Sequence, residues 1–306
     1  QGMTQEEWQK INSDPQKPLF NRVISGIGYP TGSTIKPLIG IAALEEGIIN
    51  GNTQLYSPLE ICIQNPWYPE KEDCYADWQY HGTSDIKRAI AESVNTFFYQ
   101  VGGGYESFKG LGVTKIKKWL EIFGWGTETG IDLFEEGKGI LPNLEDDWRL
   151  GDTYHLSIGQ GKFSITPLQV TSAYVAIANK GKIFQPQVVQ KIINSNKEII
   201  KEINPKIVRT IPAQEKNLEI VRQGMKQAVT SPQGSSYILN SLPVSAAAKT
   251  GTAQTGQEDV YHNWVTVFAP YDNPKIVLTV IIENVKGLQA AALPVAKEVL
   301  DRYFSK

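Results

Sequence analysis

The chain has few cysteines, no long apolar run and no excess of either charge. Its 306 residues include 2 cysteines, too few for the disulfide framework on which small secreted scaffolds depend. No apolar run reaches the roughly 20 residues that a membrane-spanning helix needs, and the polar residues 1–14 lack the apolar core of a signal peptide. The 30 Lys and Arg nearly balance the 32 Asp and Glu, which argues against non-specific nucleic-acid binding and a polybasic membrane patch.

The composition that remains is that of a folded protein, with 41% hydrophobic and 20% charged residues. Apolar periodicity and cap residues predict helices over 33–47, 84–102, 115–123, 166–179, 213–229 and 289–303. Alternating patterns predict a β-hairpin over 187–203 and strands over 246–252, 263–269 and 275–282, the last two joined by the turn YDNP. A mostly helical first half with late strands predicts an α+β fold in which helices flank an antiparallel sheet.

Residues 51–83 differ from their surroundings. They hold three prolines, both cysteines and little helical periodicity. We interpret them as a long ordered insertion, since long loops in folded domains are usually functional or held by a cross-link such as a disulfide or a metal.

The first chemical motif is Ser33-Thr34-Ile35-Lys36 at the start of a predicted helix. Residues three apart share a helix face, so Lys36 can reach Ser33, which also has the chemistry of an N-cap. A serine hydroxyl becomes a good nucleophile only when a base takes its proton, and a neutral lysine can be that base. The same spacing recurs in Ser84–Lys87, where we expect only a helix cap and a solvated lysine.

Two further motifs follow in order. Ser93-Val94-Asn95 lies inside the predicted helix 84–102, and Lys249-Thr250-Gly251-Thr252 lies in the predicted strand 246–252. A strand with a lysine, a glycine and two hydroxyls offers a cation, close backbone approach and hydrogen-bond donors. Each motif alone also fits a solvent-facing surface.

The combination S-x-x-K, S-x-N and K-T-G in this order resembles the signature of penicillin-binding proteins and serine β-lactamases. The resemblance extends along nearly the whole chain, through the segments Tyr29–Pro37, Gly130–Leu133, Ile158–Gly161, Thr166–Gln169 and Phe268–Tyr271. It implies the transpeptidase fold of that family, with an antiparallel sheet flanked by helices and an all-helical subdomain, over residues 1–306.

Within the family, the long connection from Ser93 to Lys249 resembles a transpeptidase more than a compact β-lactamase. Residues 18–22, the pair Asp77-Trp78 followed by His81-Gly82, and residues 95–100 resemble the class B, elongation-type group known as penicillin-binding protein 2. The division-type class B group is the nearest competitor.

The resemblance implies a serine-type D,D-transpeptidase of peptidoglycan. Ser33 would attack the D-Ala-D-Ala bond of a stem peptide, Lys36 would be the general base, and Ser93 would relay the proton to the leaving amine. An amine from a neighbouring stem would then resolve the acyl-enzyme and form the cross-link. A β-lactam antibiotic would acylate Ser33 by imitating the dipeptide.

The resemblance also implies the residues that hold the substrate. Asn95 would bind the substrate amide, and Lys249 would attract its carboxylate and help to keep Lys36 neutral. The hydroxyls of Thr250 and Thr252, on either side of Gly251, would bind that carboxylate. The backbone N–H groups of Ser33 and Thr252 would form the oxyanion hole.

Other functions of the same fold are a D,D-carboxypeptidase, a β-lactamase, or a non-catalytic β-lactam sensor or scaffold. The resemblance implies partners in the cell-wall elongation complex, including a glycosyltransferase, and no nucleic acid. It implies the extracytoplasmic, periplasmic face of the bacterial envelope. Family members have an N-terminal membrane helix, a non-catalytic domain and two sheet strands that are not found ahead of Gln1, so we expect this chain to be a catalytic-domain piece.

The insertion 51–83 gathers Cys62, Cys74, Asp77 and His81 within 20 residues. Such a set is chemically suited to a tetrahedral structural zinc, and some elongation-type relatives carry zinc here, bound by Asp, His and Cys. Asp77 and His81 match that pattern, but further ligands do not align. The alternatives are a disulfide between Cys62 and Cys74, or free thiols with a hydrogen-bonded histidine. Catalysis itself needs no cofactor on this interpretation.

Overall fold

The computed structural model describes residues 2–145 and 147–305, so three residues of the expected 1–306 domain (1, 146 and 306) lie outside it. The helices are α1 (Gln5–Asn12), η1 (Gly32–Ile35), α2 (Lys36–Glu45), α3 (Ile86–Ala91), α4 (Asn95–Gly103), α5 (Gly112–Ile122), α6 (Leu150–Ser157), α7 (Pro167–Ala178), α8 (Glu215–Thr230), η2 (Tyr237–Ser241) and α9 (Ala292–Phe304). The strands are β1 (Leu55–Ser57), β2 (Glu60–Gln64), β3 (Glu72–Ala76), β4 (Gly82–Ser84), β5 (Lys182–Phe184), β6 (Lys191–Ile193), β7 (Ile199–Glu202), β8 (Ile207–Thr210), β9 (Ala247–Gln254), β10 (Val260–Ala269) and β11 (Ile276–Lys286).

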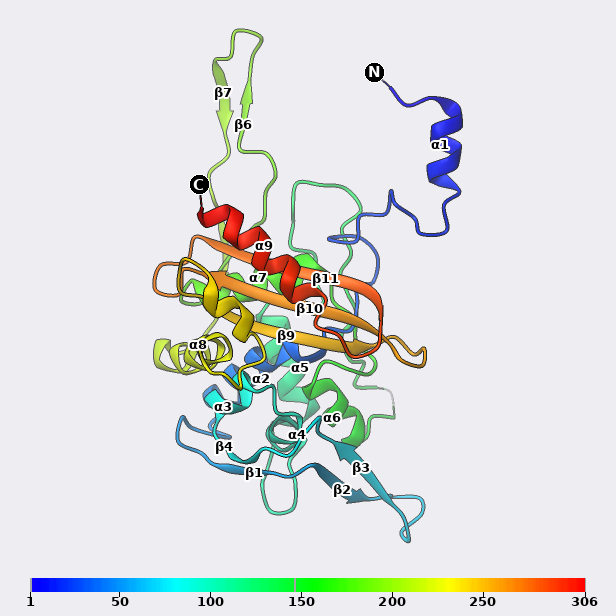
Figure 1. Cartoon of the computed structure of the whole chain (residues 1–306), viewed down its shortest axis with the longest axis vertical. Coiled ribbons are helices and arrows are strands. Elements are labelled where there is room, and N and C mark those ends of the chain that lie inside the picture. Colours follow the sequence, from blue (N-terminus) through cyan, green and yellow to red (C-terminus); the bar gives the residue numbers. More distant parts are fainter. Residues whose placement is uncertain (1, 146, 306) are drawn as a thin grey trace.

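The main sheet is antiparallel, in the order β11-β10-β9, which confirms the strands expected late in the chain. Helix α9 packs on one face, where Leu293 and Leu300 join the apolar side chains of β10. Helices α2, α7 and α8 lie on the other side (Figure 1). Because both faces are covered, the central strand β10 is buried over seven consecutive residues and shows no polar alternation.

Helix α2 is the centre of the main core. Its residues from Lys36 to Leu44 are all buried. A helix that is apolar on every side must be surrounded, and α2 packs against α3, α4, α5 and α8. The helical part of the predicted α+β fold is therefore built around the helix that begins just after Ser33.

The structure corrects three local expectations. The helix expected over 84–102 is two helices, α3 and α4, with a break at Ser93. Asp85, not Ser84, caps α3, because the Asp85 carboxylate accepts the backbone N–H of Arg88. Ser33 is not an N-cap either, since it lies within η1, which is preceded by Thr31.

The insertion 51–83 is ordered, as expected, and forms the antiparallel pairs β1–β4 and β2–β3. The expected hairpin near 187–203 is also present as β6–β7, which projects away from the body (Figure 1). Helix α6 was not predicted, because its eight residues are too few to show a periodic apolar pattern. In the described residues, no helix has the length and apolar character needed to cross a membrane.

Candidate active site

A cavity of about 820 Å³ lies along β9, and residues of all three sequence motifs line it. Ser33 comes from η1, Ser93 and Asn95 come from the break between α3 and α4, and Thr250–Thr252 come from the sheet. Residues separated by more than 200 positions thus share one wall. The second S-x-x-K sequence is absent from this wall, with Ser84 in strand β4 and Lys87 in α3.

The backbone that leads into Ser33, the candidate nucleophile, packs directly against the backbone of β9. A Cβ added to Gly251 would lie 2.6 Å from the carbonyl oxygen of Thr31, and one added to Gly32 would lie 2.6 Å from that of Thr252. Gly32 also has φ +52°, which a residue with a side chain rarely adopts. Glycine at both positions therefore lets the backbones of Ser33 and Thr252 approach the same point of the cavity.

Two buried lysines meet at the hydroxyl of Ser93. The Lys249 ammonium donates to Ser93 Oγ at 2.7 Å, and Lys36 Nζ lies 3.4 Å from the same oxygen. Lys36 Nζ also donates to the Ser93 carbonyl and to Asn95 Oδ1, both at 2.7 Å. Among the described residues, Ser33 Oγ is not a hydrogen-bond partner of Lys36, although one helical turn joins them. Proton-transfer contacts often tighten only when substrate binds.

Burial changes the acid–base properties of both lysines. It lowers the pKa of Lys36 to about 7, against an opposing attraction from Asp77. Burial likewise lowers the pKa of Lys249 well below its ordinary value, and the nearby Lys36 charge lowers it further. We expected the Lys249 charge to help to keep Lys36 neutral, whereas burial is what lowers the pKa of Lys36. A base that is partly neutral near pH 7 is suited to activating a hydroxyl.

The segment from Glu92 to Thr96, here called the Ser93 loop, places its side chains by breaking the helix. Ser93 has φ +61°, in the left-handed region that is unfavourable for a residue with a side chain. This conformation ends α3, and α4 begins anew at Asn95. We expected Ser93 and Asn95 to lie inside one continuous helix that prolongs α3. The break instead places both residues in the wall of the cavity.

Several residues of the cavity wall were not among the expected site residues. They are Trp78, Tyr99, His155, Gln254 and Tyr261. The ring of His155 also contacts Tyr75 edge-on. These side chains come from five separate elements or loops, so neither periodicity nor spacing could have grouped them.

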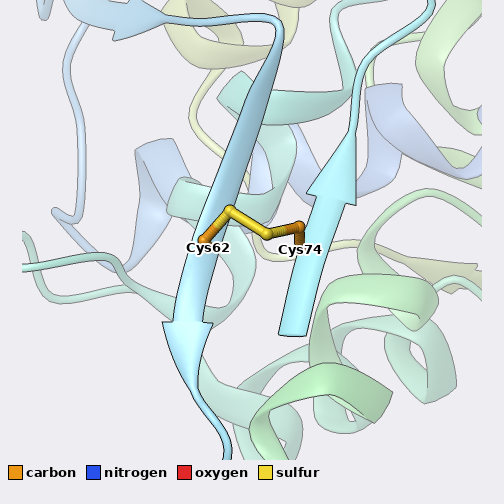
Figure 2. The surroundings of a disulfide bond; sticks show 2 residues. All are labelled: Cys62 and Cys74. Atoms are coloured by element: carbon orange, nitrogen blue, oxygen red, sulfur yellow. A yellow bond between two sulfur atoms is a disulfide. The ribbon is translucent and has the colours of Figure 1, made fainter. Parts of the chain in front are cut away.

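The cysteines of the insertion are bonded to each other. Cys62 and Cys74 face one another across β2 and β3, and their sulfur atoms form a disulfide (Figure 2). Of the three alternatives for this loop, the structure has the disulfide. Neither residue is then the thiolate ligand that a zinc site would require, which corrects their assignment as metal ligands.

Replacing both Cys62 and Cys74 by alanine is expected to lower the free energy of unfolding of the β2–β3 hairpin by about 3 kcal/mol, because the bond closes a short loop in the unfolded chain. The two residues are 12 positions apart. Hydrogen exchange of the hairpin amides measures the effect, and reduction of the unmodified protein should reproduce it. Two free thiols in the oxidised, purified protein would contradict the prediction.

The remaining proposed ligands, Asp77 and His81, do not form a zinc site with the residues around them. Asp77 already accepts hydrogen bonds from Thr96 and from the backbone of Trp78, and its nearer oxygen is 3.7 Å from His81 Nε2. In the described part of the chain, no third His, Cys, Asp or Glu joins this pair in a metal-sized cluster. A closed structural zinc needs four ligands, so the residues present do not fit it.

The geometry is that of a site for serine acyl chemistry. It combines Ser33, which lies directly before α2, with the buried Lys36, whose pKa is lowered, and with Ser93, whose hydroxyl lies between two lysine amines. Glycines at 32 and 251 also let the backbone of η1 pack closely against that of β9 beside the serine. Such an arrangement can form and stabilise a tetrahedral intermediate at a carbonyl carbon.

Comparison with known proteins agrees with this geometry. The family model described as the penicillin binding protein transpeptidase domain matches residues 3–304. The peptidoglycan D,D-transpeptidase MrdA of Haemophilus influenzae is 32% identical, over 100% of this chain and 48% of its own length. The structure of penicillin-binding protein PBP2 from Helicobacter pylori has a TM-score of 0.81 and 32% identity, over 99% of this chain and 54% of that chain, and another structure shows it in complex with MreC.

The chain thus spans about half the length of the curated relatives that it matches. The relatives named MrdA and PBP2 confirm the resemblance to penicillin-binding protein 2. The structural similarity confirms the expected α+β transpeptidase fold. This chain belongs to the penicillin-binding protein transpeptidase family.

Proposed function

We propose that this chain is the catalytic domain of a peptidoglycan D,D-transpeptidase that acts through a Ser33 acyl-enzyme. The observation that carries the proposal is the convergence of Ser33 and Ser93 on one cavity, where Ser93 is hydrogen-bonded to the buried Lys249 and the buried Lys36 has a pKa of about 7. The family and the activity of its named relatives support the same reaction class.

In the first step, Ser33 Oγ attacks the carbonyl carbon of the penultimate D-alanine, and its proton passes to neutral Lys36. The negative charge on the carbonyl oxygen is stabilised by the backbone N–H groups of Ser33 and Thr252, each worth about 3 kcal/mol in comparable enzymes. The C–N bond then breaks, and the leaving D-alanine amine takes the proton that Lys36 accepted, relayed through Ser93 Oγ, which lies near Lys36 and is hydrogen-bonded to Lys249. The product is an ester on Ser33.

In the second step, an amine of a neighbouring stem peptide attacks the ester carbonyl, and Ser33 recovers its proton. A new amide joins the two stems. Asn95 and the hydroxyls of Thr250 and Thr252 would bind the substrate amide and its carboxylate. A β-lactam would acylate the same serine, because its strained amide occupies the place of the dipeptide bond.

The test is a time course with fluorescent penicillin and the full chain. We expect one label per chain, on the tryptic peptide that contains Ser33, retained for far longer than labelling takes. Rapid release of the label would instead indicate a β-lactamase, and absence of label would indicate a non-catalytic scaffold. A donor stem peptide offered with an acceptor amine separates the remaining alternative, since a carboxypeptidase yields hydrolysed product alone.

The rate of acylation is expected to rise with pH through about 7 and then to level off. Lys36 must be neutral to accept the Ser33 proton, and burial sets its pKa near that value. Below pH 7 the amine is protonated and the base is lost. The second-order rate constant for penicillin, measured from pH 5.5 to 9, checks this, and a constant or falling profile over that range would exclude Lys36 as the base.

We further propose that the domain works outside the cytoplasm in the bacterial envelope, within a cell-wall elongation complex. Its relatives are named peptidoglycan transpeptidases, and the one from Helicobacter pylori forms a complex with MreC. The elongation assignment rests on the likeness to penicillin-binding protein 2. A glycosyltransferase that supplies uncross-linked strands is the second partner we expect. Co-purification of the protein with these partners tests the assignment.

A further inference from the structure

The Ser93 loop needs support, because its central residue is in an unfavourable conformation. A non-glycine residue in the left-handed region is strained and persists only where its surroundings hold it. Ser93 has φ +61°, and Lys36 donates to its carbonyl. The two ends of the loop, Glu92 and Thr96, are each held by a further side chain from outside the loop.

Glu92 is fixed by two donors. Its Oε1 accepts from Arg88 Nε at 2.8 Å, and its Oε2 lies 2.9 Å from His81 Nδ1. The Glu92 carboxylate that pairs with Arg88 offers only acceptor atoms, so the Nδ1–H of His81 is the donor in this contact.

Thr96 is fixed by Asp77. One oxygen of the Asp77 carboxylate accepts from both the backbone N–H and the hydroxyl of Thr96, at 2.8 and 2.9 Å. The N-cap residue Val94 has no side-chain acceptor of its own. Asp77 therefore satisfies an otherwise free N–H in the first turn of α4 and places a negative charge at its positive end.

His81 stands between these two carboxylates. Its side chain is fully buried, with Nδ1 on Glu92 and Nε2 facing Asp77 at 3.7 Å. The ring thus spans the gap between the groups that hold the two ends of the Ser93 loop. Relatives that carry a metal in this insertion would use side chains of these types as ligands, but the residues found here do not complete a four-ligand set.

We propose that His81 is a positioning residue: it braces Glu92 through Nδ1, and with Asp77 on Thr96 it holds the Ser93 loop in its catalytic conformation without a metal. The proposal rests on the proposed acyl-enzyme function. The proposal and a metal-site interpretation require different ring nitrogens of His81. A zinc bound at this pair would use Nε2, which faces Asp77, whereas bracing uses Nδ1.

Two matched amide variants separate these atoms. The amide nitrogen of asparagine reaches the position of Nδ1, and that of glutamine reaches the position of Nε2. His81→Asn is expected to acylate at close to the wild-type rate. His81→Gln is expected to lower the acylation rate at saturating penicillin on the order of 10- to 100-fold, the range that follows a displacement of about 1 Å in a catalytic group.

The non-covalent binding constant of penicillin should stay nearly unchanged in both variants, because His81 does not line the cavity. Ser57→Ala is the control. Its buried hydroxyl has no hydrogen-bond partner in the described structure and lies on β1, opposite Gly82 and next to His81. It should acylate normally. Equal rates for the Asn and Gln variants, or a faster Gln variant, would overturn the proposal.

Metal analysis and hydrogen exchange complete the test. The wild-type protein should contain far less than one zinc per chain and should keep its acylation rate in EDTA; stoichiometric zinc with loss of rate on chelation would overturn the proposal. Exchange of the amides at 92–96 should be faster in His81→Gln than in His81→Asn. This measurement needs no activity, so it decides the bracing role even if penicillin fails to label the wild type.

Discussion

Ser33→Ala is expected to abolish covalent labelling by penicillin, with no residual adduct at any incubation time. The substitution removes the only atom that forms the acyl bond in the proposed mechanism, so the loss is complete and not merely a slower rate. The fold should be unaffected, because Ser33 is only partly buried and makes no side-chain hydrogen bond that a described residue depends on. Gel fluorescence and intact mass measure the adduct.

The chain supplies a matched control for this experiment. Ser84 begins the second S-x-x-K sequence, but it lies in β4 and away from the cavity. Ser84→Ala should label like the wild type. Labelling of Ser33→Ala at the wild-type level would remove Ser33 from the proposed role, whereas loss of label in Ser84→Ala alone would move the nucleophile to the other motif.

Lys36→Met is expected to slow acylation by roughly 10²- to 10⁴-fold, the contribution typical of a positioned general base. Methionine preserves most of the volume of the buried side chain but cannot accept a proton. The change also leaves the Ser93 carbonyl and Asn95 Oδ1 without the donor that now reaches both, so the Ser93 loop should loosen as well. Stopped-flow acylation at saturating penicillin isolates the chemical step.

Two measurements keep this prediction specific. Lys87→Met, in the second S-x-x-K sequence, should leave the rate unchanged, because Lys87 lies on α3 outside the cavity. The residual rate of Lys36→Met should also lose the rise near pH 7. A Lys36→Met protein that is cooperatively folded and acylates within a few-fold of wild type would show that another group takes the Ser33 proton.

Much of the fold could be predicted because it depends on local pattern. Thr166 followed by Pro167 marks the start of α7, where the Thr166 hydroxyl accepts from the backbone of Gln169. The turn at 271–274 separates β10 from β11 as expected. The break at Ser93 was not predicted, because no proline or glycine marks it between Ser84 and Val101. The left-handed residue there is stabilised by Lys36 and by the neighbours of the loop, which come from distant parts of the chain.

In the insertion 51–83, too, the sequence predicted some features and the tertiary structure decided others. The sequence placed two cysteines, an aspartate and a histidine within 20 residues, and such a composition suits a disulfide or a metal equally well. The pairing of β2 with β3 decided between them, since register alone brings Cys62 opposite Cys74. Asp77 then turns toward α4 and His81 toward Glu92, contacts for which the spacing of residues gave no indication.

The sequence by itself determined the family and the order of the chemical motifs. Acyl transfer requires particular residue types, and the spacing of these residues within each motif can be read directly from the sequence. The tertiary structure decided that Ser33 and Ser93 line one cavity, that Lys249 is hydrogen-bonded to Ser93 and that Lys36 is buried. It also decided that burial lowers the pKa of Lys36. The physical reason is that desolvation and contact depend on how the chain packs, and packing joins residues that sequence separation keeps far apart.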